Sequence, residues 1–164
     1  MVERGVEMLQ VNRILCPVDF STPCYEALAQ ARELASHFSA QMILLHVVSP
    51  IPVIPNSTFP SAAHVPDLLN EMEDSARQSL AEVEKEMAEK GIESRCLVLH
   101  GSPADQIVSA ASTEKADLVV IATHGMTGWK RVLFGSVAEK VVRHCKCPVL
   151  TIRSQKTEEK ESRG

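Results

Sequence analysis

At 164 residues, with 45% hydrophobic and 23% charged side chains, the chain has the length and composition of one globular domain. A formal net charge of −4 and an aromatic content of 4% argue against a non-specific nucleic-acid binder, which needs a basic face and aromatic stacking platforms. The N-terminus lacks the apolar core of a signal peptide, no run approaches the roughly 20 apolar residues of a membrane span, and the five cysteines are an odd number. These features predict a cytoplasmic protein with reduced thiols.

Apolar runs and helical patterns alternate along the chain. Short apolar runs predict strands over residues 13–18, 42–48, 92–99, 118–123 and 148–152. Helical spacing predicts helices over residues 23–37 and 67–90, from Pro103 onward, and over 136–145. Thr22 and Ser102 are the expected N-caps, because each precedes a proline that suits the first helical position. Residues 49–66 contain five prolines and are expected to form a long loop.

This order predicts a single-domain α/β fold, an open parallel five-stranded sheet of Rossmann-like type with helices on both faces. We expect the domain to cover residues 12–153, between an N-terminal extension (1–11) and a disordered charged tail (154–164). The last strand could lie at a sheet edge. There an apolar run would invite pairing with a second copy of the chain, through Val149, Leu150, Thr151 and Ile152.

Residues with usable chemistry follow each predicted strand, and in a parallel sheet they gather at one edge. Asp19 could accept a hydrogen bond from an adenine amino group or a ribose hydroxyl, and the Val47 backbone could meet the adenine edge. A strand, a glycine loop and a helix start follow one another over residues 117–136. Backbone N–H groups at Gly125, Gly135 and Ser136 could therefore cradle phosphates.

Structural roles are the competing interpretation of the same residues. Asp19 could hold its own turn as an Asx motif, and Ser136 with Glu139 fits a capping box. Gly125 and Gly128 could simply form a turn, and the histidines could be part of the framework (His46, His100 and His124). Lys130 and Arg131 could be exposed loop charges. Cys145 and Cys147 could be small packed thiols. For the two thiols a metal site is disfavoured, since no second ligand pair with zinc spacing follows them.

Several of these stretches resemble the universal stress protein (UspA-like) family. They are Cys16-Pro-Val-Asp-Phe-Ser21, Leu45-His-Val47, Thr123-His-Gly-Met-Thr-Gly128 and the run from Phe134 to Leu150. The resemblance extends from Asn12 to Arg153. It implies a fold of the adenine nucleotide alpha hydrolase type.

The ATP-binding branch of that family has glycine, two residues, glycine, nine residues, glycine, and then serine or threonine. Gly125, Gly135 and Ser136 match this pattern, whereas Ala122 stands at the first glycine, where its methyl group could crowd a ribose. By the resemblance, Pro17, Val18, Asp19 and Val47 lie on the base and ribose side of a nucleotide. The ribose and phosphate side comprises Ala122, His124, Gly125, Gly135, Ser136 and Val137.

The resemblance implies a dimeric stress-response or signalling protein that binds ATP or AMP, with Mg²⁺ accompanying a triphosphate and an unidentified protein as partner. Two alternatives remain open: a dimeric stress protein that binds no nucleotide, and a slow Mg²⁺-dependent ATPase. The sequence contains no Gly-x-x-x-x-Gly-Lys-Ser/Thr loop, no Ser-Gly-Gly-x-Asp-Ser loop and no His-x-Gly-His motif. We therefore expect no dedicated ATP-hydrolysing enzyme.

Overall fold

The computed structural model describes residues 10–52, 64–124 and 134–154. Within them, strands and helices alternate as predicted. The elements, in chain order, are β1 (Arg13–Pro17), α1 (Thr22–Phe38), β2 (Gln41–Val48), α2 (Val65–Glu89), β3 (Ser94–His100), α3 (Pro103–Thr113), β4 (Leu118–Ala122), α4 (Ser136–His144) and β5 (Val149–Ile152).

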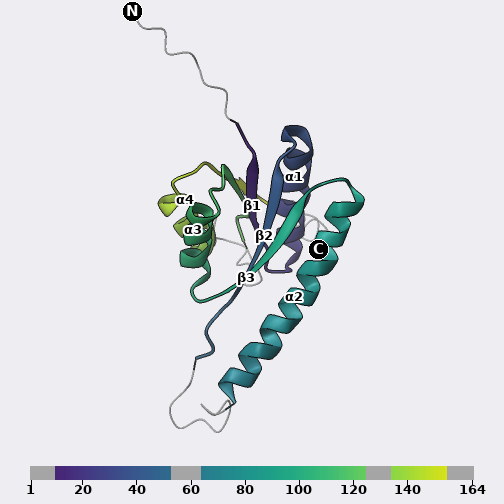
Figure 1. Cartoon of the computed structure of the whole chain (residues 1–164). Helices are drawn as coiled ribbons and strands as arrows, with labels where there is room; N and C mark the ends of the chain where they lie inside the picture. The colour runs from purple at the N-terminus through teal and green to yellow at the C-terminus, as the bar shows by residue number, and fades with distance from the viewer. Residues whose placement is uncertain (1–9, 53–63, 125–133, 155–164) are drawn as a thin grey trace, which may run out of the picture.

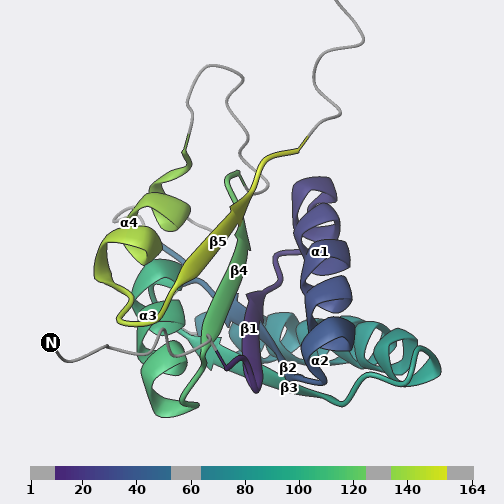
Figure 2. The same ribbon diagram turned by 90° about the horizontal axis from the view of Figure 1, so that it is seen from above.

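The strands form one sheet in the order β3-β2-β1-β4-β5, and all neighbours pair in parallel. Helices α1 and α2 cover one face, and α3 and α4 cover the other (Figures 1 and 2). The predicted α/β class, parallel sheet and edge position of the last strand are confirmed. The chain moves outward from β1 in one direction through β2 and β3, and then in the other through β4 and β5. The strand order therefore reverses between β1 and β4.

Two hydrophobic cores, one on each face, hold the helices to the sheet. Ile14 and Cys16 of β1 belong to the core under α1 and α2. Leu15, between them, belongs to the core under α3 and α4. Successive strand residues point to opposite faces, so the central strands need apolar residues at nearly every position. This is why β1, β2 and β4 are continuous apolar runs.

Three helix starts differ in detail from expectation. Ser21, not Thr22, caps α1: its hydroxyl accepts a hydrogen bond from the Cys24 N–H at 3.3 Å. Pro66 was predicted to lie in the loop but occupies the first turn of α2, where its missing N–H removes no helical hydrogen bond. Ser102 is the N-cap of α3 as predicted, although its side chain forms no capping bond. Residues 53–63 of the predicted loop lie outside the described residues.

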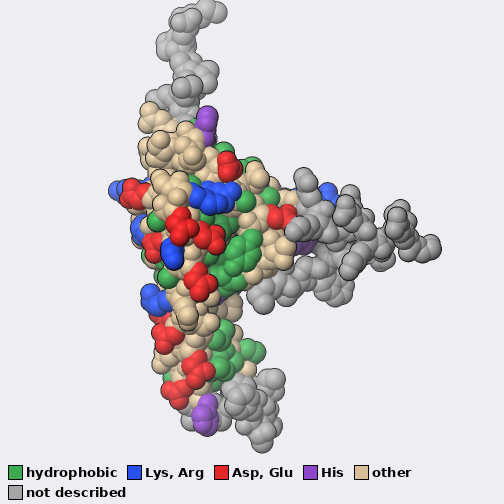
Figure 3. All heavy atoms as spheres, turned by 90° about the vertical axis from the view of Figure 1, so that its right-hand side faces the viewer, with side chains coloured by type: hydrophobic (Ala, Val, Ile, Leu, Met, Phe, Trp, Pro, Cys, Tyr) green, Lys and Arg blue, Asp and Glu red, His purple; other side chains and the backbone are tan. Residues whose placement is uncertain are grey.

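Helix α2 packs on the sheet through its C-terminal part, where it buries Ala76, Leu80, Val83 and Met87. Its N-terminal part extends past the end of β3 (Figure 1). On the side of the molecule seen in Figure 3, acidic and basic side chains are interspersed. The charged side chains of α2 are exposed or half-buried, as is typical of a solvated helix face. None of the helices in the described ranges is both long and apolar enough to span a membrane.

Candidate functional site

The candidate site lies where β1 and β4 stop pairing, a point we call the β1–β4 fork. These two strands pair only at Ile14↔Leu118 and Leu15↔Val119. Each strand nevertheless remains paired with its outer neighbour beyond this point, β1 for two more residues to Pro17↔Leu45 and β4 for three more to Ala122↔Ile152. The sheet is therefore open at its carboxyl edge where the strand order reverses, which is where parallel α/β sheets bind ligands.

Pro17 gives a physical reason for the fork. The Val18 N–H donates to Leu45 O in β2 at 2.7 Å. Backbone N–H groups alternate in direction along a strand, so the nitrogen of Pro17 faces β4. Proline has no N–H and cannot donate the next hydrogen bond of the β1–β4 ladder. The ladder ends two residues earlier, at Leu15.

On the β1 side of the fork, Asp19 is held in a tight turn. Its Oδ1 accepts hydrogen bonds from the Ser21 N–H at 3.0 Å and from the Ser21 hydroxyl at 2.6 Å. This is the Asx motif that the sequence offered as the structural interpretation of Asp19. These two hydrogen bonds give the Asp19 carboxylate a structural role in the turn. Val18, just before it, is buried.

His46 and Phe20 complete this side. The imidazole Nδ1 of His46 lies 2.7 Å from Val18 O. The Phe20 ring stacks on that imidazole, with centroids 5.0 Å apart and an interplanar angle of 28°. His46 thus has the framework contact considered for it. Phe20 was not singled out, and its positive φ of 62° has no signal in the sequence, because bulky residues rarely adopt it.

On the β4 side, a backbone hydrogen bond closes the loop between β4 and α4. The Gly135 N–H donates to Thr123 O at 2.7 Å. A Cβ atom on Gly135 would lie 3.1 Å from the same oxygen. Since φ at Gly135 is an ordinary −68°, glycine is required here for close approach and not for an unusual backbone conformation.

Gly135 is also the N-cap of α4, and Ser136 is the first helical residue. The predicted capping box of Ser136 with Glu139 is therefore wrong: no side chain caps this helix, and the Glu139 carboxylate pairs with Arg143 at 2.7 Å. The N–H groups of a first helical turn have no partner within their helix. Ser136 is exposed at that turn, while Val137 is half-buried against the α3/α4 core.

The other predicted residues lie on or next to the strands of the sheet. Ala122 ends β4, half-buried, on the α1 side of the sheet by alternation with Val120. His124 follows it, with Nδ1 3.1 Å from the buried Thr123 hydroxyl. Val47 lies on β2, one strand further from the fork. Gly125, Gly128, Lys130 and Arg131 lie outside the described residues.

A cavity of about 260 Å³ lies elsewhere, at the amino ends of β4 and β5. None of the predicted nucleotide residues lines it. Its basic side chains, Lys115, His144 and Lys146, stand beside the C-terminal ends of α3 and α4. Basic groups stabilise helix C-termini, so these side chains have a structural explanation there. Within the described ranges, no group of three or more histidine, cysteine, aspartate or glutamate side chains is arranged to hold a metal ion.

The thiols behind the β1 turn are poor nucleophiles. Burial raises the pKa of Cys16 well above its usual value, and burial raises the pKa of Cys24 to about 11. The Cys24 Sγ lies 3.6 Å from Pro17 O. Burial is also the main cause that raises the pKa of Cys145 to about 11. These values fit packed thiols, as expected for Cys145 and Cys147.

Fold and fork together define a Rossmann-like α/β domain whose sheet opens at the strand-order reversal, where folds of this kind bind ligands. The chain belongs to the universal stress protein family, whose model matches residues 10–153. It is 36% identical over 147 residues to universal stress protein MJ0531 of Methanocaldococcus jannaschii, covering 90% of this chain and 85% of that one. The solved structure of hypothetical protein MJ0577 superposes with a TM-score of 0.79 at 26% identity, covering 90% of this chain and 99% of the other.

Two more distant structures share the fold and were solved with nucleotides. One is a universal stress protein in complex with cAMP, with a TM-score of 0.61 at 20% identity, covering 88% of this chain and 98% of that one. The other is the universal stress protein from Archaeoglobus fulgidus in complex with dAMP, with a TM-score of 0.58 at 22% identity, covering 88% and 99%.

Proposed function

We propose that this universal stress protein binds an adenine nucleotide, ATP or AMP, at the β1–β4 fork. The Asp19 turn would contact the base or ribose, and the start of α4 at Gly135 and Ser136 would contact phosphate. Mg²⁺ would accompany a triphosphate. The protein would act as a cytoplasmic, dimeric stress-response or signalling protein whose domain covers residues 12–153.

The observation that carries this proposal is the fork itself. β1 and β4 separate after Leu15 and Val119 while their outer pairings continue. A carboxylate turn therefore follows one strand of the fork, and a helix N-terminus begins after the other. An acceptor for hydroxyl or amino groups after one strand, and after the other a first helical turn whose N–H groups have no partner within their helix, suit a nucleoside phosphate. The nucleotide complexes of the two structural neighbours lend support.

Thermal unfolding with ATP, ADP, AMP and cyclic AMP, each with and without Mg²⁺, tests the proposal. A ligand at about 100 times its dissociation constant adds roughly 2.7 kcal/mol to stability. For a domain of this size the midpoint should rise by about 5–10 °C. Mass spectrometry of the denatured protein would identify any nucleotide carried from expression.

Two variants distinguish the fork from a non-specific effect. Gly135→Val adds bulk where even a Cβ would lie 3.1 Å from Thr123 O, so it should abolish the nucleotide shift. Ser109→Ala removes an exposed hydroxyl from the middle of α3 and should keep the shift. An unchanged midpoint with all four nucleotides, and none released, would instead favour the stress protein that binds no nucleotide.

Hydrolysis is tested separately. Phosphoryl transfer needs a positioned nucleophile and neutralised phosphate charge, and we propose at most slow turnover. Phosphate release from Mg²⁺-ATP should not exceed that of Ser136→Ala. Release well above this control would favour the ATPase alternative.

We also propose that the dimer forms through β5. This strand lies at the edge of the sheet, and Leu150 is 38% exposed on it. An unpaired apolar edge favours addition of another strand. Sedimentation at micromolar concentration should give a dimer for the wild type and a monomer for Leu150→Lys, with the exposed Val142→Lys on α4 as a comparison. A wild-type monomer would contradict the proposal.

A further inference from the structure

His46 contacts the β1 turn on both sides of Asp19. The residue before Asp19 is Val18, whose carbonyl oxygen lies 2.7 Å from His46 Nδ1. The residue after it is Phe20, whose ring stacks on the imidazole at 5.0 Å. One side chain from β2 thus contacts both neighbours of Asp19, the backbone of Val18 and the ring of Phe20.

The contact with Val18 O defines the tautomer of His46. A carbonyl oxygen only accepts hydrogen bonds, so Nδ1 must carry the proton and donate. In the neutral ring, Nε2 is then the unprotonated nitrogen. The ring is also held in place by the stack with Phe20, so its orientation and its tautomer support each other.

Phe20 shows that the turn depends on such support. Its φ of 62° lies in the left-handed region, which a bulky L-residue rarely occupies unless its surroundings hold it there. The stack with His46 supplies a contact that holds the ring. Directly before it, the Asp19 carboxylate accepts from the Ser21 N–H and hydroxyl. Relaxation of Phe20 would therefore move Asp19.

We propose that His46 is the positioning residue that sets the Asp19 carboxylate for a ligand at the β1–β4 fork. This inference rests on the proposed nucleotide function and deepens it. His46 acts by donating from Nδ1 to Val18 O and by stacking on Phe20. The hydrogen bond sets where the turn leaves β1, and the stack sets the direction in which it continues to α1.

Two substitutions separate the donor from the ring. His46→Asn places an amide N–H at the position of Nδ1 and so keeps the donor without the ring. His46→Phe keeps an aromatic ring for the stack but has no donor. His37→Asn, at the exposed end of α1, is the matched control for losing a histidine.

Calorimetric titration with AMP and ATP, together with imidazole ¹⁵N NMR, provides the test. We expect wild-type His46 to carry a proton on Nδ1. His46→Phe should weaken nucleotide binding about tenfold, as expected for one lost hydrogen bond, and His46→Asn should recover part of that loss. A protonated Nε2 with a bare Nδ1, or wild-type affinity in His46→Phe, would overturn the proposal.

Amide hydrogen exchange of Ser21 distinguishes this failure from failure of the proposed function. The Ser21 N–H donates to Asp19, so its protection reports the turn without any ligand. If the wild type binds no nucleotide, faster Ser21 exchange in His46→Phe than in His37→Asn still supports positioning by His46. Unchanged Ser21 exchange in His46→Phe would refute it.

Discussion

Adding a side chain at Gly135 should destabilise the protein in proportion to the size of that side chain. A Cβ at this position would lie 3.1 Å from Thr123 O, where ordinary contact begins at 3.4 Å. The start of α4 and the end of β4 must therefore separate by about 0.3 Å. The hydrogen bond between Gly135 N and Thr123 O would lengthen from 2.7 Å to about 3.0 Å, which is still a good bond.

For Gly135→Ala the cost is therefore modest. Overpacking by one carbon costs typically about 1–3 kcal/mol. The smaller entropy of the unfolded alanine chain offsets about 0.4–1 kcal/mol of this. We expect a net loss of about 1 kcal/mol, which lowers the midpoint by about 2–4 °C. Gly135→Val adds two more carbons and should cost about 2–3 kcal/mol.

Urea unfolding followed by circular dichroism would measure both variants, and Gly91 is the matched control. Gly91 has φ of +73°, and beyond its chain neighbours no atom lies within 4 Å of the place that a Cβ would take. The stability lost on replacing Gly91 should therefore come from backbone strain alone. Gly91→Asn should therefore be milder than Gly91→Ala, since asparagine tolerates the left-handed region. If Gly135→Ala is as stable as the wild type, and Gly135→Val no worse, the close-approach argument is refuted.

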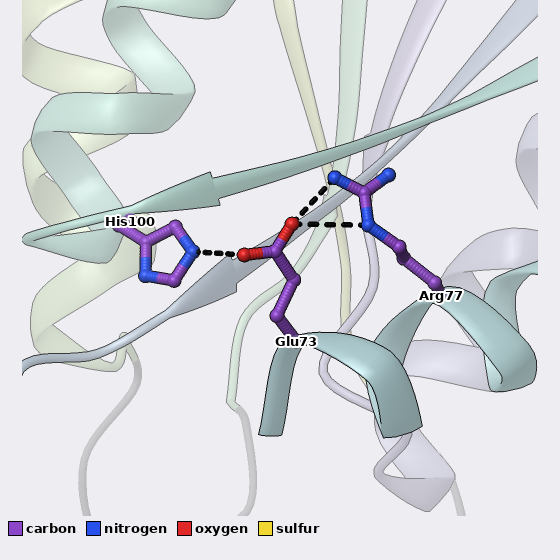
Figure 4. A network of polar contacts seen from close by, with 3 residues as sticks. All are labelled: Glu73, Arg77 and His100. Atoms are coloured by element: carbon purple, nitrogen blue, oxygen red, sulfur yellow. Dashed lines mark hydrogen bonds and ion pairs between the residues drawn. The ribbon is translucent and has the colours of Figure 1, made fainter. Parts of the chain in front are cut away.

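Three further predictions concern the framework. Asp117→Ala removes a carboxylate that accepts two backbone N–H groups at the start of β1, at 2.8 and 2.9 Å; urea unfolding should show a loss of about 1–3 kcal/mol, and equal stability would contradict this. The hydrogen bond from His100, and then the neighbouring arginine, lower the pKa of Glu73 (Figure 4). The ionised Glu73 carboxylate contributes to folding stability fully above the ordinary glutamate pKa, and this contribution is lost as pH falls through the lowered pKa. The stability of Glu73→Gln should therefore differ from that of the wild type at neutral pH but not in strong acid. A stability difference that persists in acid would refute the role of the ionised carboxylate. With its pKa raised to about 11, Cys24 should react with iodoacetamide at pH 8 about a hundredfold more slowly than when unfolded; equal rates would show that it is not buried.

Much of the fold could be predicted because parallel strands buried on both faces must be apolar throughout. The helical spacing of apolar residues then located the helices, and the glycine and proline positions marked the boundaries between elements. The sequence could not decide which of two adjacent residues of similar type caps a helix. Ser21 and Thr22 are both good N-caps, and the choice follows from the Asp19 turn, which binds Ser21.

The candidate site depended on tertiary structure more strongly. Nothing in the apolar runs shows that β1 lies beside β4, because each strand could pair with any other. Strand order and register create the fork, and Pro17 ends the ladder only because its nitrogen faces β4. Likewise, the sequence by itself predicted that Gly135 directly precedes a helix and follows a glycine loop. Only the folded chain brings Thr123 O so close that a side chain on Gly135 would collide with it, since that contact joins the residue after β4 to the residue before α4.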